Sequence, residues 1–435
     1  MFRAERKLRV CVIGAGAAGL CALRHLASDQ AAFEITAYEQ TDHVGGTWVY
    51  SESVGAEVHS SMYENLRTNL PSEIMNFPDW RKMGGGARSC ITHTQVLSYL
   101  EDYANHFDLR KYITFKARID TIRPDTQPSL APSASFSPGR TIWKVKIKNM
   151  TNQTMEEKEF DAVICANGHF FEPNIPSIPG IETFSGQAFH SHDYRRPQPF
   201  TDKTVVILGA ASSGADIGIE LAGYARHVYI SHNTPRIAST LLSNMTETMG
   251  VTRVEGNRFV FKDGTSVLAD TFIYCTGYNY SFPFLSESCK INVEDNYVHP
   301  LYRHLINVEY PTMCFIGIPA SVIPFPMFHI QVQYFIAVLK GNVVLPPKEN
   351  MLENSVYRTP IKRHAHRLAD NQWDYNDALA RDGHFDPLPL MYRAGYTAWK
   401  VQRGRNLLHY KEAKFVVDDD GESVQIIIND HNIND

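Results

Sequence analysis

The sequence predicts an α/β fold, because a short apolar strand is followed twice by a glycine-rich turn, a helix and a second strand. Such a unit starts a parallel, doubly wound sheet that binds a dinucleotide. The two units lie roughly 190 residues apart, which is too far for one sheet of the usual size. With 435 residues, the chain is long enough for several domains of roughly 150 residues. We therefore expect two dinucleotide-binding, Rossmann-like domains.

Apolar spacing predicts the elements of both units. The first unit consists of a strand at Arg9–Ile13, a helix at Ala17–Ser28 and a strand at Phe33–Glu39. The second unit consists of a strand at Thr204–Leu208, a helix at Ala215–Ala225 and a strand at His227–Ser231. Outside the units, the pattern predicts strands at Thr141–Lys148, Asp161–Ala166 and Thr271–Cys275 and helices at Thr94–Phe107 and His329–Leu339. The segment Arg123–Arg140, rich in Pro and Ser, predicts a surface loop, whereas Asp418–Asp420 and Ile426–Ile428 receive no assignment.

Composition limits the class of protein. The 42 basic and 47 acidic residues give a net charge of −5, which argues against a broad surface for nucleic acid. The seven cysteines are scattered, with no CxxC pair and no zinc-type spacing, so a disulfide framework and a metal site are not expected. Gly and Pro interrupt the longest apolar stretch, Met313–Phe328, which is too short to span a bilayer. We expect a soluble protein without a membrane anchor.

The first glycine turn is Gly14-Ala-Gly16-Ala-Ala-Gly19, between a strand and a helix. Its glycines allow a tight turn, a close approach to a pyrophosphate and close helix packing, and the helix N-terminus faces the phosphates. Glu39 ends the next strand and can accept hydrogen bonds from ribose hydroxyls. Because a carboxylate repels a 2′-phosphate, this site suits FAD or NAD better than NADP.

The second turn, Gly209-Ala-Ala-Ser-Ser-Gly214, has Ala211 in place of the middle glycine. The strand that follows ends at Ser231 and His232 with Arg236 nearby, and no acid follows it directly. Such groups suit a 2′-phosphate, so this site predicts NADPH. Two sites of different ribose chemistry imply transfer of electrons from NADPH to a flavin.

The absence of cysteine excludes one class of flavoenzyme. Disulfide reductases of this architecture carry a cysteine pair shortly after the first unit, but this chain has no cysteine from Ala22 to Ser89. We therefore expect no dithiol relay. The domains are predicted as a first FAD-binding part at 1–171, an inserted NADPH-binding domain at 172–292, and a second FAD-binding part with a C-terminal extension at 293–435.

Three further motifs resemble those of the flavin-containing monooxygenases. Phe184-x-Gly186-xxx-His190-xxx-Tyr194-Arg195 is similar to that family's fingerprint, and Tyr194 stands where the related Baeyer–Villiger enzymes carry Trp. The segments at 66–71 and 270–278 resemble the family's active-site Asn stretch and its ATGY-type motif. Within the family, the chain is similar to soluble insect members, including pyrrolizidine-alkaloid N-oxygenases.

The resemblance implies roles for individual residues. FAD contacts are implied at Gly14, Gly16, Ala17, Ala18, Gly19, Glu39, Gln40, Thr47 and Trp48, with further cofactor contacts at Thr68, Asn69, Leu70, Thr276, Gly277 and Gln331. NADPH contacts are implied at Ser213, Gly214, Asp216, Ser231, His232 and Arg236. Asn69 is the one residue given a catalytic role. The fingerprint is expected to dock the two domains, with His190 structural rather than catalytic.

The resemblance implies an NADPH- and O2-dependent monooxygenase. It would oxygenate the nitrogen or sulfur of a small molecule through an FAD C4a-hydroperoxide, as in N-oxidation of tertiary amines such as pyrrolizidine alkaloids. The sequence leaves open an NADPH-dependent flavin reductase or oxidase that releases H2O2, and a non-catalytic nucleotide sensor. It also leaves open a homo-oligomer. A cytoplasmic location is expected from the sequence as it stands, or secretion if a signal peptide has been removed; sequons at Asn149, Asn152, Asn244 and Asn279 fit secretion.

Overall fold

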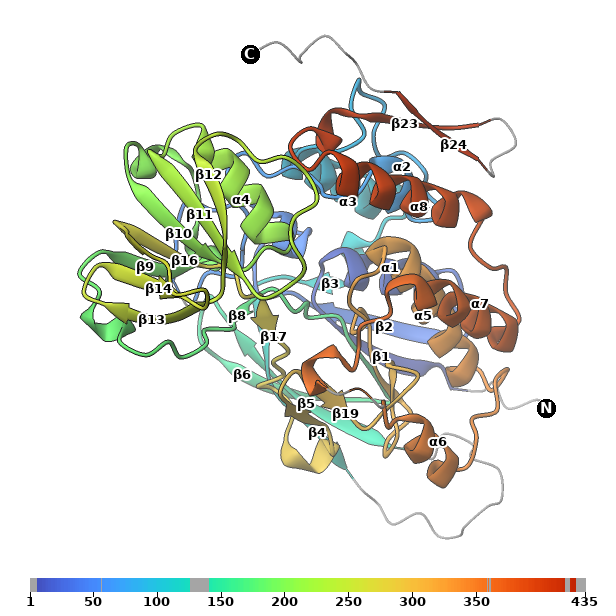
Figure 1. Cartoon of the computed structure of the whole chain (residues 1–435). Helices are drawn as coiled ribbons and strands as arrows, with labels where there is room; N and C mark the ends of the chain where they lie inside the picture. Colours follow the sequence, from blue (N-terminus) through green and yellow to red (C-terminus); the bar gives the residue numbers. More distant parts are fainter. Residues whose placement is uncertain are drawn as a thin grey trace, which may run out of the picture.

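The computed structural model describes residues 6–55, 57–125, 141–357, 359, 361–418 and 423–427, which form two α/β domains (Figure 1). The larger domain contains a seven-stranded sheet in the order β20-β21-β22-β7-β1-β2-β3. Its strands are β1 (Leu8–Ile13), β2 (Phe33–Tyr38), β3 (Ile113–Thr114), β7 (Ala162–Cys165), β20 (Leu301–Tyr302), β21 (Ile306–Asn307) and β22 (Met313–Phe315). β1 pairs in parallel with both β2 and β7, as the first predicted unit requires.

Alternate residues of β1 enter two different cores. Val10 and Val12 pack with the helices on one face of the sheet, and Cys11 and Ile13 pack on the other face. The helical face is formed mainly by α1 (Ala17–Ala27), α3 (His93–His106), α5 (Pro324–Leu339) and α7 (Gln372–Gly383). The opposite face is covered by a three-stranded sheet, β4 (Ala117–Asp125), β5 (Ile142–Asn149) and β6 (Met155–Phe160). Buried on both faces, β1 reads as a continuous apolar run, which explains why it is recognisable from sequence.

The smaller domain repeats this plan. Its sheet has the order β12-β11-β10-β16-β9 and is parallel throughout. The strands are β9 (Gln187–His190), β10 (Thr204–Leu208), β11 (His227–His232), β12 (Met245–Met249) and β16 (Thr271–Tyr274). Helix α4 (Ser212–Ala222) covers one face, and a small sheet of β13 (Val251–Glu255), β14 (Arg258–Phe261) and β15 (Ser266–Leu268) covers the other.

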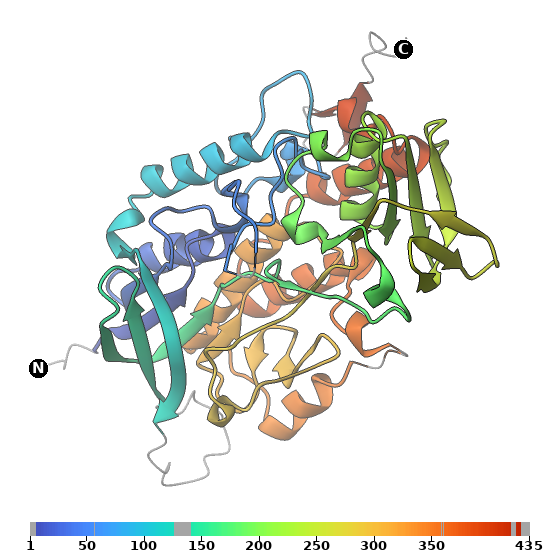
Figure 2. The same ribbon diagram turned by 90° about the vertical axis from the view of Figure 1, so that its left-hand side faces the viewer.

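The chain enters and leaves the smaller domain through two short strands that lie side by side. These are β8 (Glu172–Pro173) and β17 (Tyr278–Asn279), which pair in antiparallel fashion. Figure 2 shows the smaller domain, coloured green to yellow, at one side of the larger one. Beyond β17, Tyr280, Phe284 and Cys289 already pack in the core of the larger domain. The chain therefore re-enters that domain before the predicted boundary at 292.

The C-terminal segment lies across both domains. It contains α6 (Lys348–Asn354), α8 (Leu390–Arg405), β23 (Lys414–Val417) and β24 (Val424–Ile427), and follows the hairpin of β18 (Asn292–Glu294) and β19 (Tyr297–His299). α8 and the β23–β24 hairpin pack on α2 (Ser72–Met75), as Figure 1 shows in red and blue. On the smaller domain, the backbone NH of Leu407 donates to Ser239 Oγ at 3.0 Å.

The structure departs from the sequence expectations in four places. The helix predicted from His329 begins at Pro324, because proline is tolerated in the first turn, where its missing NH has no partner to lose. The helix predicted from Ala215 begins at Ser212, directly after the glycine turn. The unassigned Ile426 belongs to β24, which pairs with β23. The predicted loop at 123–140 falls mostly outside the described residues, and β4 continues through Asp125.

Among the described helices, none is both long and apolar enough to cross a membrane.

Candidate active site

Two glycines of the first turn, Gly14 and Gly19, have no room for a side chain. Gly14 has a φ of +95°, and a Cβ there would lie 2.8 Å from the carbonyl oxygen of Ala166. A Cβ on Gly19 would lie 1.9 Å from the carbonyl oxygen of Gly14. Gly16 faces Gly46, and a Cβ on Gly46 would come within 2.9 Å of the Cα of Gly16. The backbone thus forms an open cradle at the N-terminus of α1, whose first turn carries no acidic residue.

Glu39 holds this cradle from the end of β2. Its Oε2 accepts from the NH of Ala15 at 2.9 Å, and Oε1 accepts from the NH and hydroxyl of Thr41 at 2.9 Å each. The residue is 6% exposed, so the carboxylate is fixed beside the turn with acceptor capacity to spare. The 3-10 turn Gly46–Trp48 carries Thr47, whose buried hydroxyl has no partner within the described chain. An unpartnered hydroxyl and a glycine cradle fit the dinucleotide predicted here, while Gln40 is exposed at the rim.

The second turn repeats this geometry. Gly209 has a φ of +112°, and a Cβ there would lie 2.4 Å from the carbonyl oxygen of Cys275. A Cβ on Gly214 would lie 1.8 Å from the carbonyl oxygen of Gly209. Ala211, which precedes α4, has φ −74° and ψ −162°, close to the −74° and −172° of Gly16 before α1. The alanine therefore keeps the helix entry, and Ser213 follows it in the first turn of α4.

The predicted 2′-phosphate residues differ in accessibility. Ser231 is fully buried and donates to the carbonyl oxygen of Met249 at 2.9 Å, so its hydroxyl is not presented to a ligand. His232 is 7% exposed and lies between Thr234 Oγ1 at 2.8 Å and Glu247 Oε1 at 2.8 Å. Only the side chain of Arg236 is open, at 90% exposure.

Glu247 is the residue that sequence reasoning missed. It stands on β12, and its Oε2 lies 3.9 Å from Arg236 Nε. The absence of an acid directly after β11 was the basis for expecting a purely basic phosphate site. The parallel pairing of β11 with β12 brings this carboxylate to the same edge. No local signal reveals it, because the pairing joins segments separated by an irregular loop.

Asn69 lies where the two domains face each other. Its Nδ2 donates to Ser212 Oγ, at the first residue of α4, over 2.9 Å. Its neighbours turn inward instead: Thr68 Oγ1 accepts from the NH of Ile91 at 3.1 Å, and Leu70 is buried in the core. Of Thr68 and Asn69, the two residues predicted between the cofactors, the structure brings only the side chain of Asn69 to the second glycine turn.

Asp216 serves the domain interface. This residue was predicted to face NADP, but its carboxylate contacts the hydroxyl of Tyr63 and the ammonium of Lys411. Tyr63 precedes β3 in the chain but packs in the core of the smaller domain, and Lys411 comes from the C-terminal segment. These contacts tie α4 to both segments, and a role of Asp216 in binding NADP stays a prediction.

The fingerprint segment joins the domains as expected. His190 is buried, accepts from the NH of His192 at 3.0 Å through Nδ1, and donates to the carbonyl oxygen of Gly277 at 2.9 Å through Nε2. Burial lowers the pKa of His190 to about 4. Thr276 donates to the carbonyl oxygen of Asn174. His190 is therefore a neutral structural group that fixes the Thr276–Gly277 segment beside the β8–β17 link.

Gln331 is the last of the residues predicted to contact a cofactor. Gln331 is fully buried in α5; its Oε1 accepts from the NH of Gly317 at 2.9 Å, and its Nε2 donates to Tyr375 at 2.8 Å. Its amide is thereby occupied in positioning the chain around Gly317. All seven cysteines are buried, free thiols. The stretch that follows the first unit, from Ala22 to Ser89, holds no cysteine for a dithiol relay.

Two glycine cradles on separate sheets, bridged by the amide of Asn69, define a two-domain oxidoreductase of the FAD- and NADPH-binding class. A family model described as flavin-binding monooxygenase-like (FMO-like) matches residues 7–250 and 233–381. The chain belongs to this family of flavin-containing monooxygenases. It is an enzyme that uses FAD and NADPH.

Relatives and solved structures agree with this assignment. The chain is 37% identical over 393 residues to the flavin-containing monooxygenase FMO GS-OX-like 1 of Arabidopsis thaliana, covering 84% of this chain and 80% of that protein. It is 36% identical over 408 residues to FMO GS-OX5 of the same plant, covering 86% and 84%. The structure of S-allyl-L-cysteine S-oxygenase from Allium sativum matches with a TM-score of 0.84 and 33% identity, covering 94% of this chain and 96% of that one.

Proposed function

We propose that this enzyme oxygenates the nucleophilic sulfur or nitrogen of a small molecule with NADPH and O2. The observation that carries the proposal is the Asn69–Ser212 hydrogen bond, which joins the larger domain to the first residue of α4, within the second glycine turn. When bound, FAD reduced by NADPH supplies the oxygen-activating chemistry. The chain then has to hold both dinucleotides, keep water away and orient the reacting atoms.

Each of these tasks has residues suited to it. The two cradles take the diphosphates on the N-termini of α1 and α4, where backbone NH groups and the helix dipole favour anions. Asn69 can donate one hydrogen bond and accept another at constant charge, which suits a position between two cofactors. Substrate activation needs no general base from the chain, because an unprotonated amine or a thioether is already nucleophilic.

The substrate class follows from the relatives. The S-oxygenase from Allium sativum, which is 33% identical to this chain, is named for S-allyl-L-cysteine. We therefore place thioethers first among the substrates to test. Tertiary amines, including pyrrolizidine alkaloids, remain the second class, because the fingerprint with Tyr194 is similar to that of N- and S-oxygenating members. Both classes present a soft lone pair.

The test measures three quantities with the purified yellow enzyme. NADPH consumption, H2O2 release and products heavier by one oxygen atom are followed with S-allyl-L-cysteine, other thioethers, tertiary amines and a pyrrolizidine alkaloid. We expect product formation to match NADPH consumption for at least one thioether or amine. Stoichiometric H2O2 with every compound would instead identify an NADPH oxidase, and a colourless protein would identify a nucleotide sensor.

A further inference from the structure

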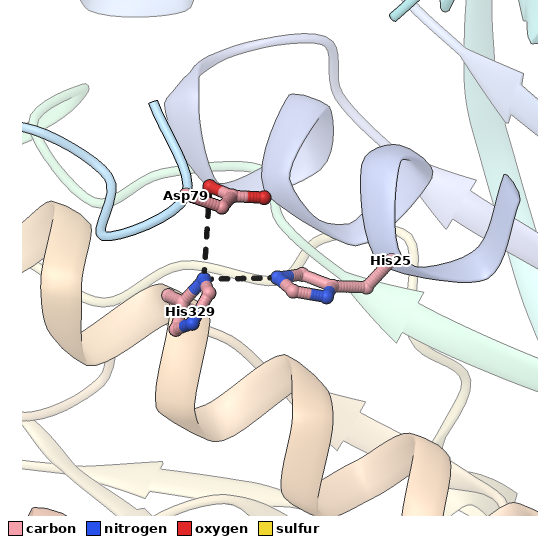
Figure 3. A group of neighbouring side chains, drawn as sticks. All are labelled: His25, Asp79 and His329. Carbon is pink, nitrogen blue, oxygen red and sulfur yellow. Dashed lines mark hydrogen bonds and ion pairs between the residues drawn. The ribbon is translucent and has the colours of Figure 1, made fainter. Parts of the chain in front are cut away.

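Two histidines and a carboxylate meet on the helical face of the larger domain (Figure 3). His25 lies in the last turn of α1, His329 lies in α5, and Asp79 follows α2. His25 Nε2 is 3.0 Å from His329 Nδ1, and Asp79 Oδ1 is 3.8 Å from the same nitrogen. Their ligand atoms all lie within 4.8 Å of one another. Among the described residues, no other group of three such side chains meets this spacing.

The carboxylate in this cluster lacks the partners that a buried charge needs. The side chain of Asp79 is 19% exposed, and neither of its oxygens has a hydrogen-bond partner of normal geometry in the described chain, although the Tyr103 hydroxyl, itself without such a partner, lies nearby. Burying an ionised carboxylate without hydrogen bonds is costly, so such a group calls for a cation or a proton. The nearest fixed cation is Arg24, whose Nε lies 3.4 Å from Asp79 Oδ2. The guanidinium of Arg24 is also held over the Phe107 ring at 4.2 Å.

Arg24 therefore faces one oxygen of Asp79 and leaves the other toward the histidines. We propose that His25, Asp79 and His329 bind one zinc-like divalent cation, with water as the remaining ligand. Two imidazoles and one carboxylate form a donor set that suits zinc and excludes magnesium and calcium, which prefer oxygen ligands. The ion would link α1 to α5 and to the loop at Asp79.

The distances agree with such an ion. Ligand atoms at about 2.0–2.2 Å from a tetrahedral zinc lie roughly 3.4 Å apart. The separations of 3.0 and 3.8 Å fall on either side of that value. The ion would replace the hydrogen bond between the two imidazoles and bring Asp79 slightly inward.

The group of mutually close ligand atoms contains no sulfur. Cys21 stands one turn before His25 on α1 but lies outside the group of mutually close ligand atoms. The coordination is therefore expected to contain nitrogen and oxygen without sulfur.

The ion site is separate from the cofactor cradle. α1 begins at Ala17, beside the glycine turn, and His25 lies near its other end. The proposed ion would stabilise the packing of α1 on α5, and saturating zinc should raise the unfolding temperature by mass action. FAD content should not depend on it.

The test uses the FAD-loaded enzyme after treatment with a chelator. Zinc chloride is titrated by calorimetry, and bound zinc is counted by elemental analysis after gel filtration. We expect one zinc per chain. D79N and H329Q should each weaken binding by roughly 10–100-fold or more, since loss of even an outer partner costs that much. H366Q is the matched control: His366 forms the other buried imidazole pair, 2.9 Å from His304 Nδ1, and has no place in the proposed site.

X-ray absorption at the zinc edge keeps the proposal testable if a variant fails to fold. In the wild-type enzyme we expect nitrogen and oxygen neighbours at about 2.0–2.2 Å, an imidazole signature and no sulfur. Less than one zinc per chain, unchanged binding in D79N and H329Q, equal loss in H366Q, or a sulfur shell would each overturn the proposal.

Discussion

At the scale of single residues, the amide of Asn69 bridges from its segment to the first residue of α4. Replacing it with alanine removes a donor and an acceptor without changing charge. We expect Asn69→Ala to retain FAD, because the first cradle and Glu39 do not depend on it, and to divert most NADPH oxidation into H2O2. The ratio of H2O2 released to NADPH consumed measures this change.

A matched control lies four residues earlier. Asn65 also donates across the domains, to Glu220 Oε1 at 2.7 Å, but it is exposed and far along α4 from the glycine turn. Asn65→Ala should keep product formation coupled to NADPH consumption. Normal coupling in Asn69→Ala, or equal uncoupling in Asn65→Ala, would rule out the role proposed for Asn69.

The lowered pKa of His190 makes the stability of the folded protein depend on pH. Its folded pKa of about 4 lies below the ordinary value of 6.5, so between these values the unfolded chain binds a proton that the folded chain does not. Its contribution is therefore fully present above about pH 6.5 and is lost progressively as the pH falls toward 4. His190→Gln keeps a donor for the Gly277 carbonyl but cannot titrate. Urea unfolding at pH 7, 6 and 5 should show a shallower pH dependence for this variant, and an unchanged slope would contradict the assignment.

The sequence predicted which residues approach the site better than which way they point. Gly14, Gly19 and Glu39 were predictable because glycine spacing and the end of a strand are local features. The hydroxyls of Thr68 and Ser231, which the sequence predicts at the cofactors, bind backbone groups instead, because the direction of a side chain depends on neighbours distant in sequence. The same holds for Glu247, which reaches the predicted phosphate edge only through strand pairing.

At the scale of elements, α1 and α4 start at the same distance from the first glycine of their turns, at Ala17 after Gly14 and at Ser212 after Gly209. This holds although the second turn has an alanine in the middle. The middle position has room for a methyl group, whereas Gly214 has none, because its Cβ would lie 1.8 Å from the carbonyl oxygen of Gly209. We expect Gly214→Ala to displace the start of α4, to destabilise the protein by about 1–3 kcal/mol and to raise the KM for NADPH at least tenfold. FAD content should stay unchanged.

The control for this prediction is another helical glycine. Gly404 in α8 has nothing within 4 Å of the place a Cβ would take. Gly404→Ala should leave both the KM for NADPH and the FAD content unaltered, and should stabilise slightly, since alanine favours a helix more than glycine does. A Gly214→Ala enzyme with the wild-type KM would show that the second cradle does not bind NADPH.

The predicted boundaries of helices and strands agree with the structure where they depend on local sequence patterns. The strands of both βαβ units were predictable, because parallel strands buried on both faces are apolar throughout. Helix α5 begins five residues before the predicted start, because its first turn accepts Pro324 and Pro326. β24 has no recognisable pattern of its own and forms only by pairing with β23.

At the scale of the whole molecule, Arg195 joins the domains. It is 6% exposed and donates to the carbonyl oxygens of Ser51, Ser53 and Ser60 in the larger domain's segment, at 2.6 to 3.3 Å. It also donates to two carbonyl oxygens of its own segment. A planar guanidinium can serve these acceptors together, which an ammonium group cannot.

The two cradles can face one another only while the domains stay docked, so Arg195 should matter for NADPH use more than for FAD retention. In Arg195→Lys some buried carbonyls lose their donors, at about 1–3 kcal/mol each. We expect a lower-temperature unfolding step to separate in calorimetry and the KM for NADPH to rise several-fold, while the protein stays yellow. The exposed neighbour provides the control, because Arg196→Lys preserves charge without touching this network and should behave as wild type. If both variants unfolded in a single step with the wild-type KM, docking would depend instead on the Lys411–Asp216 contact and the C-terminal segment.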